Sequence, residues 1–360
     1  MSTKLSDYDY DLPPEQIAQT PVEPRDASRL LVLDRASGTL AHRHFPEIWE
    51  YLRPGDVLVF NQTRVIPARL HGIKADSGGQ VELLLLHKEN EQEWRALVGG
   101  RRVGVGTRLR FTTYDGEPLD AEVTAAGERS ERTVRFEQPL EPLLERLGEV
   151  PLPPYIHEPL QDAERYQTVY AREPGSAAAP TAGLHFTPDL LVELLAQGIE
   201  MAYCTLHIGL DTFQPVTEDD PTQHKMHSER ATLRAEDALI INRAKLAGKR
   251  VIAVGTTSVR TLETAALRSA GITGDPYLDE GKICAWRPVT AIDESTDLFI
   301  RPGYRWRVVD AMITNFHLPR STLLMLVSAF AGREPVLNAY AVARDEGYRF
   351  YSFGDAMLIY

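Results

Sequence analysis

The sequence predicts a mixed α/β protein, with a barrel-like or layered body, that is interrupted by a small antiparallel β-barrel domain. Continuous apolar strands such as Val57–Phe60 and Val251–Gly255 alternate with segments of helical spacing, which is the pattern of βα units. Residues 69–150 instead contain short strand candidates, separated by Gly-rich or acidic turns, with almost no helical periodicity. We therefore expect residues 1–68 and 151–360 to form the body and residues 69–150 to form the inserted barrel.

Composition and charge are those of an ordinary globular protein. The 360 residues are 43% hydrophobic and 25% charged, enough for one large domain or two to three smaller ones. A formal net charge of -12 argues against a general nucleic-acid coat protein. Cys204 and Cys284 lie far apart, which fits a reducing compartment. With no secretory signal and no membrane-spanning apolar run, we expect a cytoplasmic protein.

The other elements follow from apolar runs, helical spacing and turn residues. The predicted helices of the body are Pro13–Ala18, Phe45–Leu52, Pro188–Gly198, Arg234–Gly248, Val259–Ser269 and Leu323–Phe330. Its predicted strands are Arg29–Asp34, Val57–Phe60, Tyr203–Gly209, Val251–Gly255 and Tyr348–Asp355, although the aromatic and charged residues of the last segment could instead stack a base. One face of the helix at 188–198 carries Leu190, Leu191, Leu194 and Leu195.

The inserted region carries strands and a basic cluster. Its strand candidates are Val81–Leu86, Glu93–Val98, Arg108–Phe111, Ala121–Val123 and Arg132–Phe136. Gly99–Gly106 is rich in glycine, but no helix follows it, so a hairpin is favoured over a dinucleotide-binding loop. The arginines in and after this loop could hold RNA phosphates or could form a solvated strand face.

Two histidines follow segments that are typical of a ligand site. Pro174–Thr187 is a run of small residues between prolines, and such side chains let a large ligand lie against the backbone. This run contains His185, and the segment Tyr203–Gly209 is predicted to be a short strand that delivers His207 to a loop. Imidazole titrates near neutral pH, so both could act as general acid or base. The alternative is two structural histidines with satisfied hydrogen bonds.

Three further motifs carry polar groups. The turn Gly255–Ser258 opens a helix and suits an anion, although an ordinary N-cap by Thr or Ser explains it equally well. The loop Thr314–Arg320 combines amide, imidazole and guanidinium groups ahead of a buried helix, which favours a functional role. His224 and His227 could join His207 around a metal, but no carboxylate stands at ligand spacing, so no metal is expected.

A series of longer motifs extends over nearly the whole chain. They are Ser28–Val32, Gly55–Asn61 with Thr63–Arg69, Tyr166–Ala171, Ala178–Phe186, Ala253–Arg260, Thr314–Pro319 and Phe353–Met357. Together they resemble the S-adenosylmethionine:tRNA ribosyltransferase-isomerase family of queuosine biosynthesis. The fold that this resemblance implies is similar to the predicted one, an α/β body interrupted by a β-barrel domain.

The resemblance implies an enzyme that consumes S-adenosylmethionine as a ribosyl donor and needs no other cofactor. The acceptor is the 7-aminomethyl-7-deazaguanine base at the wobble position of certain tRNAs. The implied products are epoxyqueuosine-tRNA, adenine and methionine. The expected partners are this tRNA and S-adenosylmethionine, with no membrane, and the expected state is a monomer.

This chemistry calls for a base, an acid and a pocket that excludes water. The sulfonium acidifies the C5′ hydrogens, adenine must be protonated to leave, and the acceptor amine must be neutral to attack the sugar carbon. We assign His185 and His207 to proton transfer, with His317 in reserve.

The remaining site predictions concern the substrates. Asn61, Arg64 and Arg69 would orient substrate, with Arg64 or Arg320 on an anionic group. Thr181 and Gly183 would line the donor site, and Thr256 with Thr257 would take the methionine carboxylate. The barrel's basic residues would meet tRNA stem phosphates, a contact that salt weakens. These residues are Arg101, Arg102, Arg108 and Arg110.

Two positions depart from the family pattern, and two rival functions remain. Asp211 stands where the family often has glycine, and Gln62 stands where it often has an acid. A carboxylate at 211 would lie near the sulfonium or face solvent. The rivals are an S-adenosylmethionine-dependent tRNA methyltransferase, which would need a GxGxG-type loop after its first strand, and a non-catalytic tRNA-binding protein. The acidic balance and the loop histidines argue against the latter.

Overall fold

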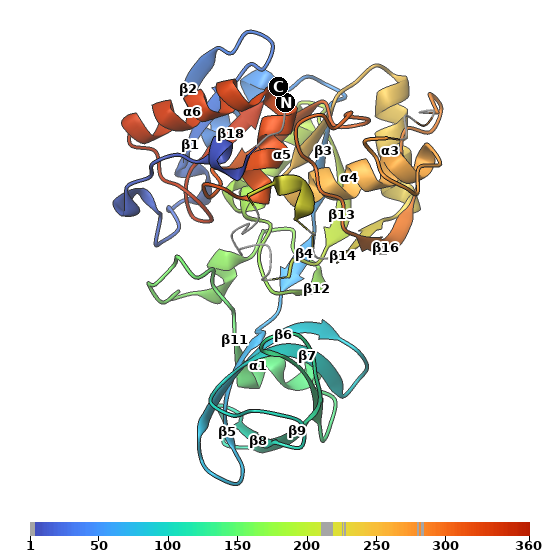
Figure 1. Cartoon of the computed structure of the whole chain (residues 1–360). Coiled ribbons are helices and arrows are strands. Elements are labelled where there is room, and N and C mark those ends of the chain that lie inside the picture. Colours follow the sequence, from blue (N-terminus) through green and yellow to red (C-terminus); the bar gives the residue numbers. More distant parts are fainter. Residues whose placement is uncertain (1–3, 210–218, 225, 227, 279–280, 282–283) are drawn as a thin grey trace. The chain divides into compact units, whose positions relative to one another are not determined.

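The computed structural model describes residues 4–209, 219–224, 226, 228–278, 281 and 284–360 (Figure 1). The chain divides into two compact units. The first consists of Met1–Thr63, Pro154–Glu173 and Ala179–Tyr360, and the second of Arg64–Pro153 and Pro174–Ala178. Among the described residues, no helix is both long enough and apolar enough to cross a membrane.

The first unit is built on one mixed sheet of nine strands, counted over its described residues. The order is β16-β14-β13-β3-β15-β17-β18-β1-β2. The bounds are β1 (Arg29–Leu33), β2 (Leu40–His44), β3 (Val57–Asn61), β13 (Glu200–Leu206), β14 (Glu229–Leu233), β15 (Val251–Val254), β16 (Ile292–Thr296), β17 (Ala311–Asn315) and β18 (Ala356–Ile359). Strands β13, β3, β15 and β17 are mutually parallel, so their carboxyl ends meet at one edge of the sheet.

Helices pack on both faces of the nine-stranded sheet. They are α2 (Pro188–Ala196), α3 (Ala235–Leu246), α4 (Thr256–Ser269), α5 (Thr322–Ala331) and α6 (Arg333–Asp345). Leu58 and Phe60 of β3 pack in one core cluster with Leu190 and Leu194 of α2. Asn61 points to the other face, because successive side chains alternate along a strand, and there it contacts α4. Leu195 is 52% exposed, so the predicted apolar face of α2 is narrower than its four leucines suggested.

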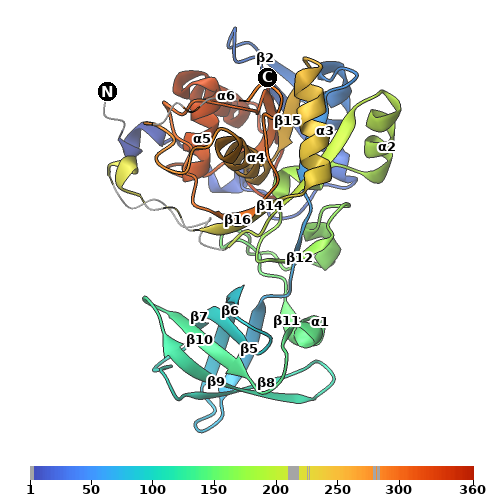
Figure 2. The ribbon, with the colours of Figure 1, turned by 90° about the vertical axis from the view of Figure 1, so that its right-hand side faces the viewer.

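The second unit, in which every residue is described, contains a closed antiparallel barrel (Figure 2). Its strands are β5 (Arg69–Lys74), β6 (Gln80–Lys88), β7 (Glu93–Gly99), β8 (Arg108–Thr112), β9 (Pro118–Ala126) and β10 (Glu131–Phe136). They follow the order β5-β6-β7-β10-β9-β8, and β8 pairs back with β5. At that closure a Cβ on Gly72 would lie 2.6 Å from the Phe111 ring, so only glycine fits.

Short elements complete both units. The second unit adds β11 (Gly148–Glu149), which pairs with β5, and α1 (Leu144–Leu147). Two short strands, β4 (Thr63–Val65) and β12 (Glu173–Ser176), pair with each other. The helices predicted near residues 13–18 and 45–52 are 3-10 helices at Pro14–Gln16 and Phe45–Tyr51. The predicted α/β class with a β-barrel is therefore confirmed.

Two local predictions are wrong. Gly99–Gly106 is no hairpin, because β7 and β8 are not neighbours in the barrel. The C-terminal strand is β18, which begins at Ala356, whereas Tyr348–Asp355 forms mainly turns. Tyr351 adopts a φ of 69°, outside the β region, and a Cβ on Gly354 would lie 2.5 Å from the Arg349 carbonyl oxygen. A continuous strand is therefore impossible in that segment.

Candidate functional site

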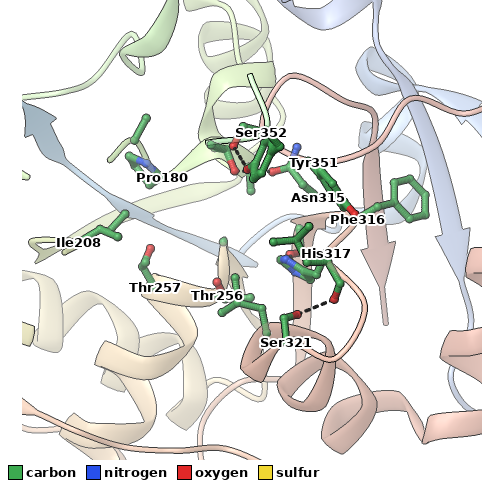
Figure 3. A pocket seen from close by; sticks show the side chains of 18 residues that line it. Pro180, Ile208, Thr256, Thr257, Asn315, Phe316, His317, Ser321, Tyr351 and Ser352 are labelled. Atoms are coloured by element: carbon green, nitrogen blue, oxygen red, sulfur yellow. Dashed lines mark hydrogen bonds between the residues drawn. The ribbon is translucent and has the colours of Figure 1, made fainter. Parts of the chain in front are cut away.

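A pocket of the first unit lies at the carboxyl edge of the parallel strands (Figure 3). It contains about 690 Å3 of empty space, part of it open to solvent. Its walls are the start of the 3-10 helix Thr181–His185, the start of α4, the loop after β13, the segment after β17 and the turn at 351–352. The lining residues are Tyr155, Ala179, Pro180, Thr181, Ala182, Ile208, Gly255, Thr256, Thr257, Thr314, Asn315, Phe316, His317, Leu318, Ser321, Leu323, Tyr351 and Ser352. Ligands of open α/β folds bind at this end of the strands.

The amino end of α4 forms part of the wall of this pocket. Gly255 is the N-cap residue, and no side chain caps the helix, so the ordinary Thr or Ser cap is absent here. The first N–H groups of an α-helix have no partner within the helix. Thr256 is 8% exposed, and its hydroxyl forms no hydrogen bond to any described residue. A carboxylate would find backbone N–H groups and this hydroxyl together.

A chain of hydrogen bonds runs from Thr181 and Asn315, which line the pocket, into the core. The Asn315 Oδ1 atom accepts a bond of 2.9 Å from the Thr181 hydroxyl. Its Nδ2 atom lies 3.2 Å from Nε2 of His185, whose Nδ1 atom lies 2.8 Å from the Ser28 hydroxyl. The amide donates to Nε2, so the ring proton is on Nδ1 and is donated to Ser28. His185 therefore orients Asn315, which lines the pocket, and has no ring nitrogen left for a ligand.

The burial of His185 predicts a pH-dependent stability. Burial lowers the pKa of His185 from 6.5 to about 3. The unfolded chain then binds a proton that the folded chain does not, so stability decreases as the pH falls from 6.5 towards 3. We expect proton binding by His185 in the unfolded chain to lower the free energy of unfolding by about 2 kcal/mol as the pH falls from 7 to 5. Urea unfolding of H185Q should show a change in unfolding free energy between pH 7 and 5 that is smaller by that amount. The same change in the variant and in the wild type would contradict the prediction.

His317, the reserve candidate, is the histidine that lines the pocket. Its Nε2 atom lies 2.8 Å from the Thr314 hydroxyl, and its backbone N–H donates to the Tyr340 hydroxyl at 2.9 Å. Its Nδ1 atom forms no hydrogen bond to a described residue. Burial lowers the pKa of His317 to about 3, so the ring is neutral at physiological pH. In the tautomer whose ring proton is on Nε2 and is donated to Thr314, Nδ1 is an acceptor for a ligand.

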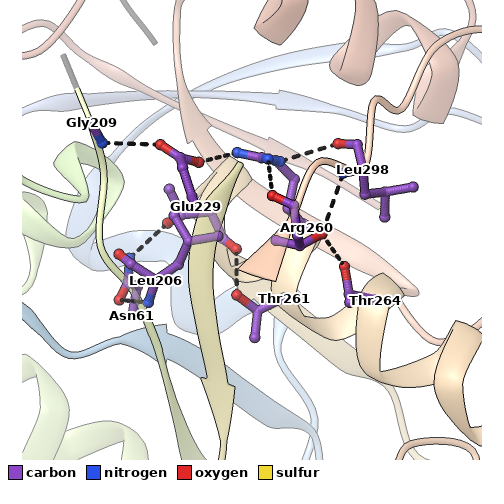
Figure 4. A network of polar contacts seen from close by, with 10 residues as sticks. Asn61, Leu206, Gly209, Glu229, Arg260, Thr261, Thr264 and Leu298 are labelled. Atoms are coloured by element: carbon purple, nitrogen blue, oxygen red, sulfur yellow. Dashed lines mark hydrogen bonds and ion pairs between the residues drawn. The ribbon is translucent and has the colours of Figure 1, made fainter. Parts of the chain in front are cut away.

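His207 lies beside the pocket rather than in its wall. Its Nδ1 atom is 2.8 Å from the Thr63 hydroxyl, and burial lowers its pKa. The next residue, Ile208, does line the pocket, and the Gly209 N–H donates to Glu229 at 3.1 Å. Glu229 also pairs with Arg260 of α4 in a buried network (Figure 4). This network holds the loop after β13 against α4.

Two predicted contact residues instead support the pocket from behind. Asn61 is fully buried, and its amide donates to the Leu206 carbonyl and the Thr257 hydroxyl. Its Oδ1 atom accepts from the N–H groups of Thr63 and Leu206, so no hydrogen-bonding capacity remains for a substrate. Gly183 does not line the pocket either. A Cβ there would lie 1.9 Å from the Tyr170 hydroxyl oxygen, so its glycine serves packing.

The predicted arginines are not among the pocket residues. Arg64 and Arg69 belong to the second unit. Arg320, placed on an anionic substrate group, instead pairs with Asp9. Arg110, expected to meet tRNA phosphate, forms a double contact of 2.7 and 2.8 Å with Asp120. The other three arginines predicted to contact tRNA are exposed and are Arg101, Arg102 and Arg108.

The structure bears on Gln62, one of the two positions that depart from the family pattern, and on the alternative of a metal site. Gln62 is buried and lies outside the pocket, with its Nε2 atom 3.4 Å from the Thr205 hydroxyl. Asp211 and His227 lie outside the described residues. Within the described ranges, no three His, Cys, Asp or Glu side chains are grouped so that they could hold a metal ion.

Sequence reasoning missed several residues of the pocket wall. Tyr155, Tyr351 and Ser352 come from segments that are distant in sequence from both predicted histidines. The interleaved aromatic residues of Tyr348–Asp355 were the available signal, and the base-stacking alternative pointed to them. Asn315 was visible as the amide of the loop that also carries His317.

The fold and the pocket define the class of this protein. It is a two-unit protein, in which one unit has an α/β sheet with a pocket at its carboxyl edge and the other contains a β-barrel. The profile of the queuosine biosynthesis protein family matches residues 5–359, so the chain belongs to that family. This confirms the resemblance seen in the motifs.

Individual relatives are similar over the full length. The chain is 57% identical over 357 residues to the S-adenosylmethionine:tRNA ribosyltransferase-isomerase of Moorella thermoacetica, covering 99% of each protein. It is 55% identical over 369 residues to the enzyme of the same name from Symbiobacterium thermophilum, again covering 99% of each. A crystal structure of S-adenosylmethionine tRNA ribosyltransferase from Thermotoga maritima is 39% identical, with a TM-score of 0.54, covering 99% of this chain and 100% of that one.

Proposed function

We propose that this chain is an S-adenosylmethionine:tRNA ribosyltransferase-isomerase. It transfers and isomerises the ribosyl moiety of S-adenosylmethionine onto a tRNA base and releases adenine and methionine. The acceptor is 7-aminomethyl-7-deazaguanine at the wobble position, and the product is epoxyqueuosine-tRNA. The electron pair of the C5′–S bond leaves with methionine, which ends the sulfonium charge, and the pair of the glycosidic bond leaves with adenine, which gains a proton. The neutral amine forms a bond to the ribosyl unit, and one proton is released overall.

The observation that carries the proposal is full-length similarity to relatives of that name, together with a pocket suited to a zwitterionic donor. The donor occupies this pocket with its methionine carboxylate at the amino end of α4, near Thr256 and Thr257. Thr181 and Asn315 contact the donor from the opposite wall. His317 accepts a proton through Nδ1, while His185 positions Asn315 and His207 supports the loop at Ile208.

Product analysis tests this function. Wild-type protein is incubated with S-adenosylmethionine and tRNA that carries the aminomethyl-deazaguanine base, and the released small molecules are quantified. Equal amounts of adenine and methionine, formed only with that tRNA, are expected. Release of S-adenosylhomocysteine would indicate a methyltransferase, and tight tRNA binding without turnover would indicate a binding protein. Either outcome would overturn the proposal.

The barrel unit is proposed to contact tRNA phosphates through Arg101, Arg102 and Arg108. Arg110 is held by Asp120, so its charge is already paired. We expect R108A to weaken tRNA binding and to reduce the slope of log affinity against log salt by about 1. R110A is the matched control on the same strand and should change the slope less. Equal effects of the two substitutions would contradict the assignment.

The other expectations from sequence remain proposals. We propose a cytoplasmic monomer that needs no cofactor beyond the consumed donor. The free thiols of Cys204 and Cys284 are compatible with a reducing compartment.

A further inference from the structure

The pocket has two chemically different ends. Figure 3 shows Thr256 and Thr257 on one side, at the start of α4, and Tyr351 with Ser352 on another. Tyr155, Phe316 and Tyr351 are the aromatic residues that line it. The Phe316 ring is 1% exposed and packs against buried rings, 5.2 Å from Tyr340 between centroids. Tyr155 is partly exposed and Tyr351 is 5% exposed, so the aromatic surface that a ligand can reach comes mainly from Tyr155, beside the ring of Tyr351.

These two tyrosines form a corner. Their ring centroids are 4.9 Å apart and their planes meet at 57°. The Tyr155 hydroxyl lies 2.7 Å from the hydroxyl of Ser352, another pocket residue. The contact connects the start of the second part of the first unit, Pro154–Glu173, to the turn before β18. A flat ligand that enters here meets the ring of one tyrosine and the edge of the other.

The backbone of Tyr351 is held in an unfavourable conformation. Its φ of 69° lies in the left-handed region, which bulky residues rarely adopt. The surrounding turn enforces it, because the buried Asp355 carboxylate accepts the N–H groups of Arg29 and Arg349, each at 2.8 Å. The Gly354 N–H also donates to the Tyr351 carbonyl at 3.0 Å. Strain that neighbouring structure maintains in this way is typical of functional sites.

We propose that the Tyr155–Tyr351 corner is the purine subsite of the pocket. The donor then lies with its adenine against these rings and its amino-acid end at the amino end of α4. Purine faces stack on aromatic side chains, whereas a carboxylate favours the partial positive charge of a helix start. Because the donor carries both groups, this inference rests on the proposed function and adds the donor's direction in the pocket.

The test separates the two halves of the donor by measuring adenosine and methionine binding independently. Y155L removes a ring, and Y155F keeps the ring but loses the bond to Ser352. We expect Y155L to weaken adenosine binding at least about fivefold with little change for methionine, and Y155F to retain most adenosine affinity. T256V removes only the unpaired hydroxyl and should weaken methionine binding with little change for adenosine.

Three results would overturn the inference. Y155L could leave adenosine affinity unchanged, it could weaken methionine binding as strongly, or T256V could weaken adenosine binding selectively. If Y155L does not fold, calorimetry of the wild type decides. Adenosine and methionine should bind together without competing, and mutual exclusion would refute separate subsites. Release of adenine and methionine by the wild type is measured in the same preparation. If these products form but the binding results contradict the inference, the donor orientation is wrong and the proposed function still stands.

Discussion

Replacing Arg260 by methionine is expected to lower the free energy of unfolding by about 3–5 kcal/mol. The side chains of Arg260 and Glu229 are only 4% and 7% exposed, and they form an ion pair. Arg260 also donates to the carbonyls of Leu298 and Thr296, at 3.2 and 3.3 Å. Its loss removes the charged partner that Arg260 provides for the buried Glu229 carboxylate, and this accounts for most of the cost. Urea unfolding at neutral pH measures the change.

The helix itself offers the matched control. Arg268, two turns further along α4, pairs with Glu294 at 2.7 Å, but these side chains are 32% and 35% exposed. Solvent screens such a pair, so R268M should cost no more than about 1 kcal/mol. The double variant E229Q/R260M removes both charges and should recover part of the loss. An R260M cost no greater than that of R268M would refute the role of burial.

Replacing His317 by alanine is expected to lower kcat at least about 100-fold, the lower end of the range for general acid–base groups. The imidazole lines the pocket, Thr314 fixes its Nε2 atom, and its Nδ1 atom is available to the donor. Because its pKa is about 3, the ring is neutral throughout the neutral range, so the loss should be nearly independent of pH between 6 and 8. Single-turnover release of adenine measures it.

His42 provides the control for this substitution. Its Nδ1 atom bonds to the Tyr348 hydroxyl at 2.8 Å, as His317 bonds to Thr314, but it lies outside the pocket. H42A should therefore retain activity near that of the wild type. H317A should unfold at a temperature close to the wild type. More than a tenth of wild-type kcat in H317A would remove His317 from the reaction.

The sequence by itself determined the fold class, many of the strands and helices, and the family. These depend on local patterns, since alternation and apolar runs record which faces of each segment are buried. The strand candidates of residues 69–150 all became barrel strands for this reason. The motifs also contained most of the pocket residues, among them Thr181, Thr256 and His317.

Only the tertiary structure decided which of these residues face the pocket. His185 and His317 look alike in sequence, yet pairing of β15 with β17 brings His317 to the wall, while Ser28 and Asn315 occupy both ring nitrogens of His185. Asn61 ends a strand as expected, but contacts with β13 and α4 consume its amide. Hydrogen-bond partners that lie more than 100 residues away leave no local pattern, so the chain reveals the candidate groups and the packing selects among them.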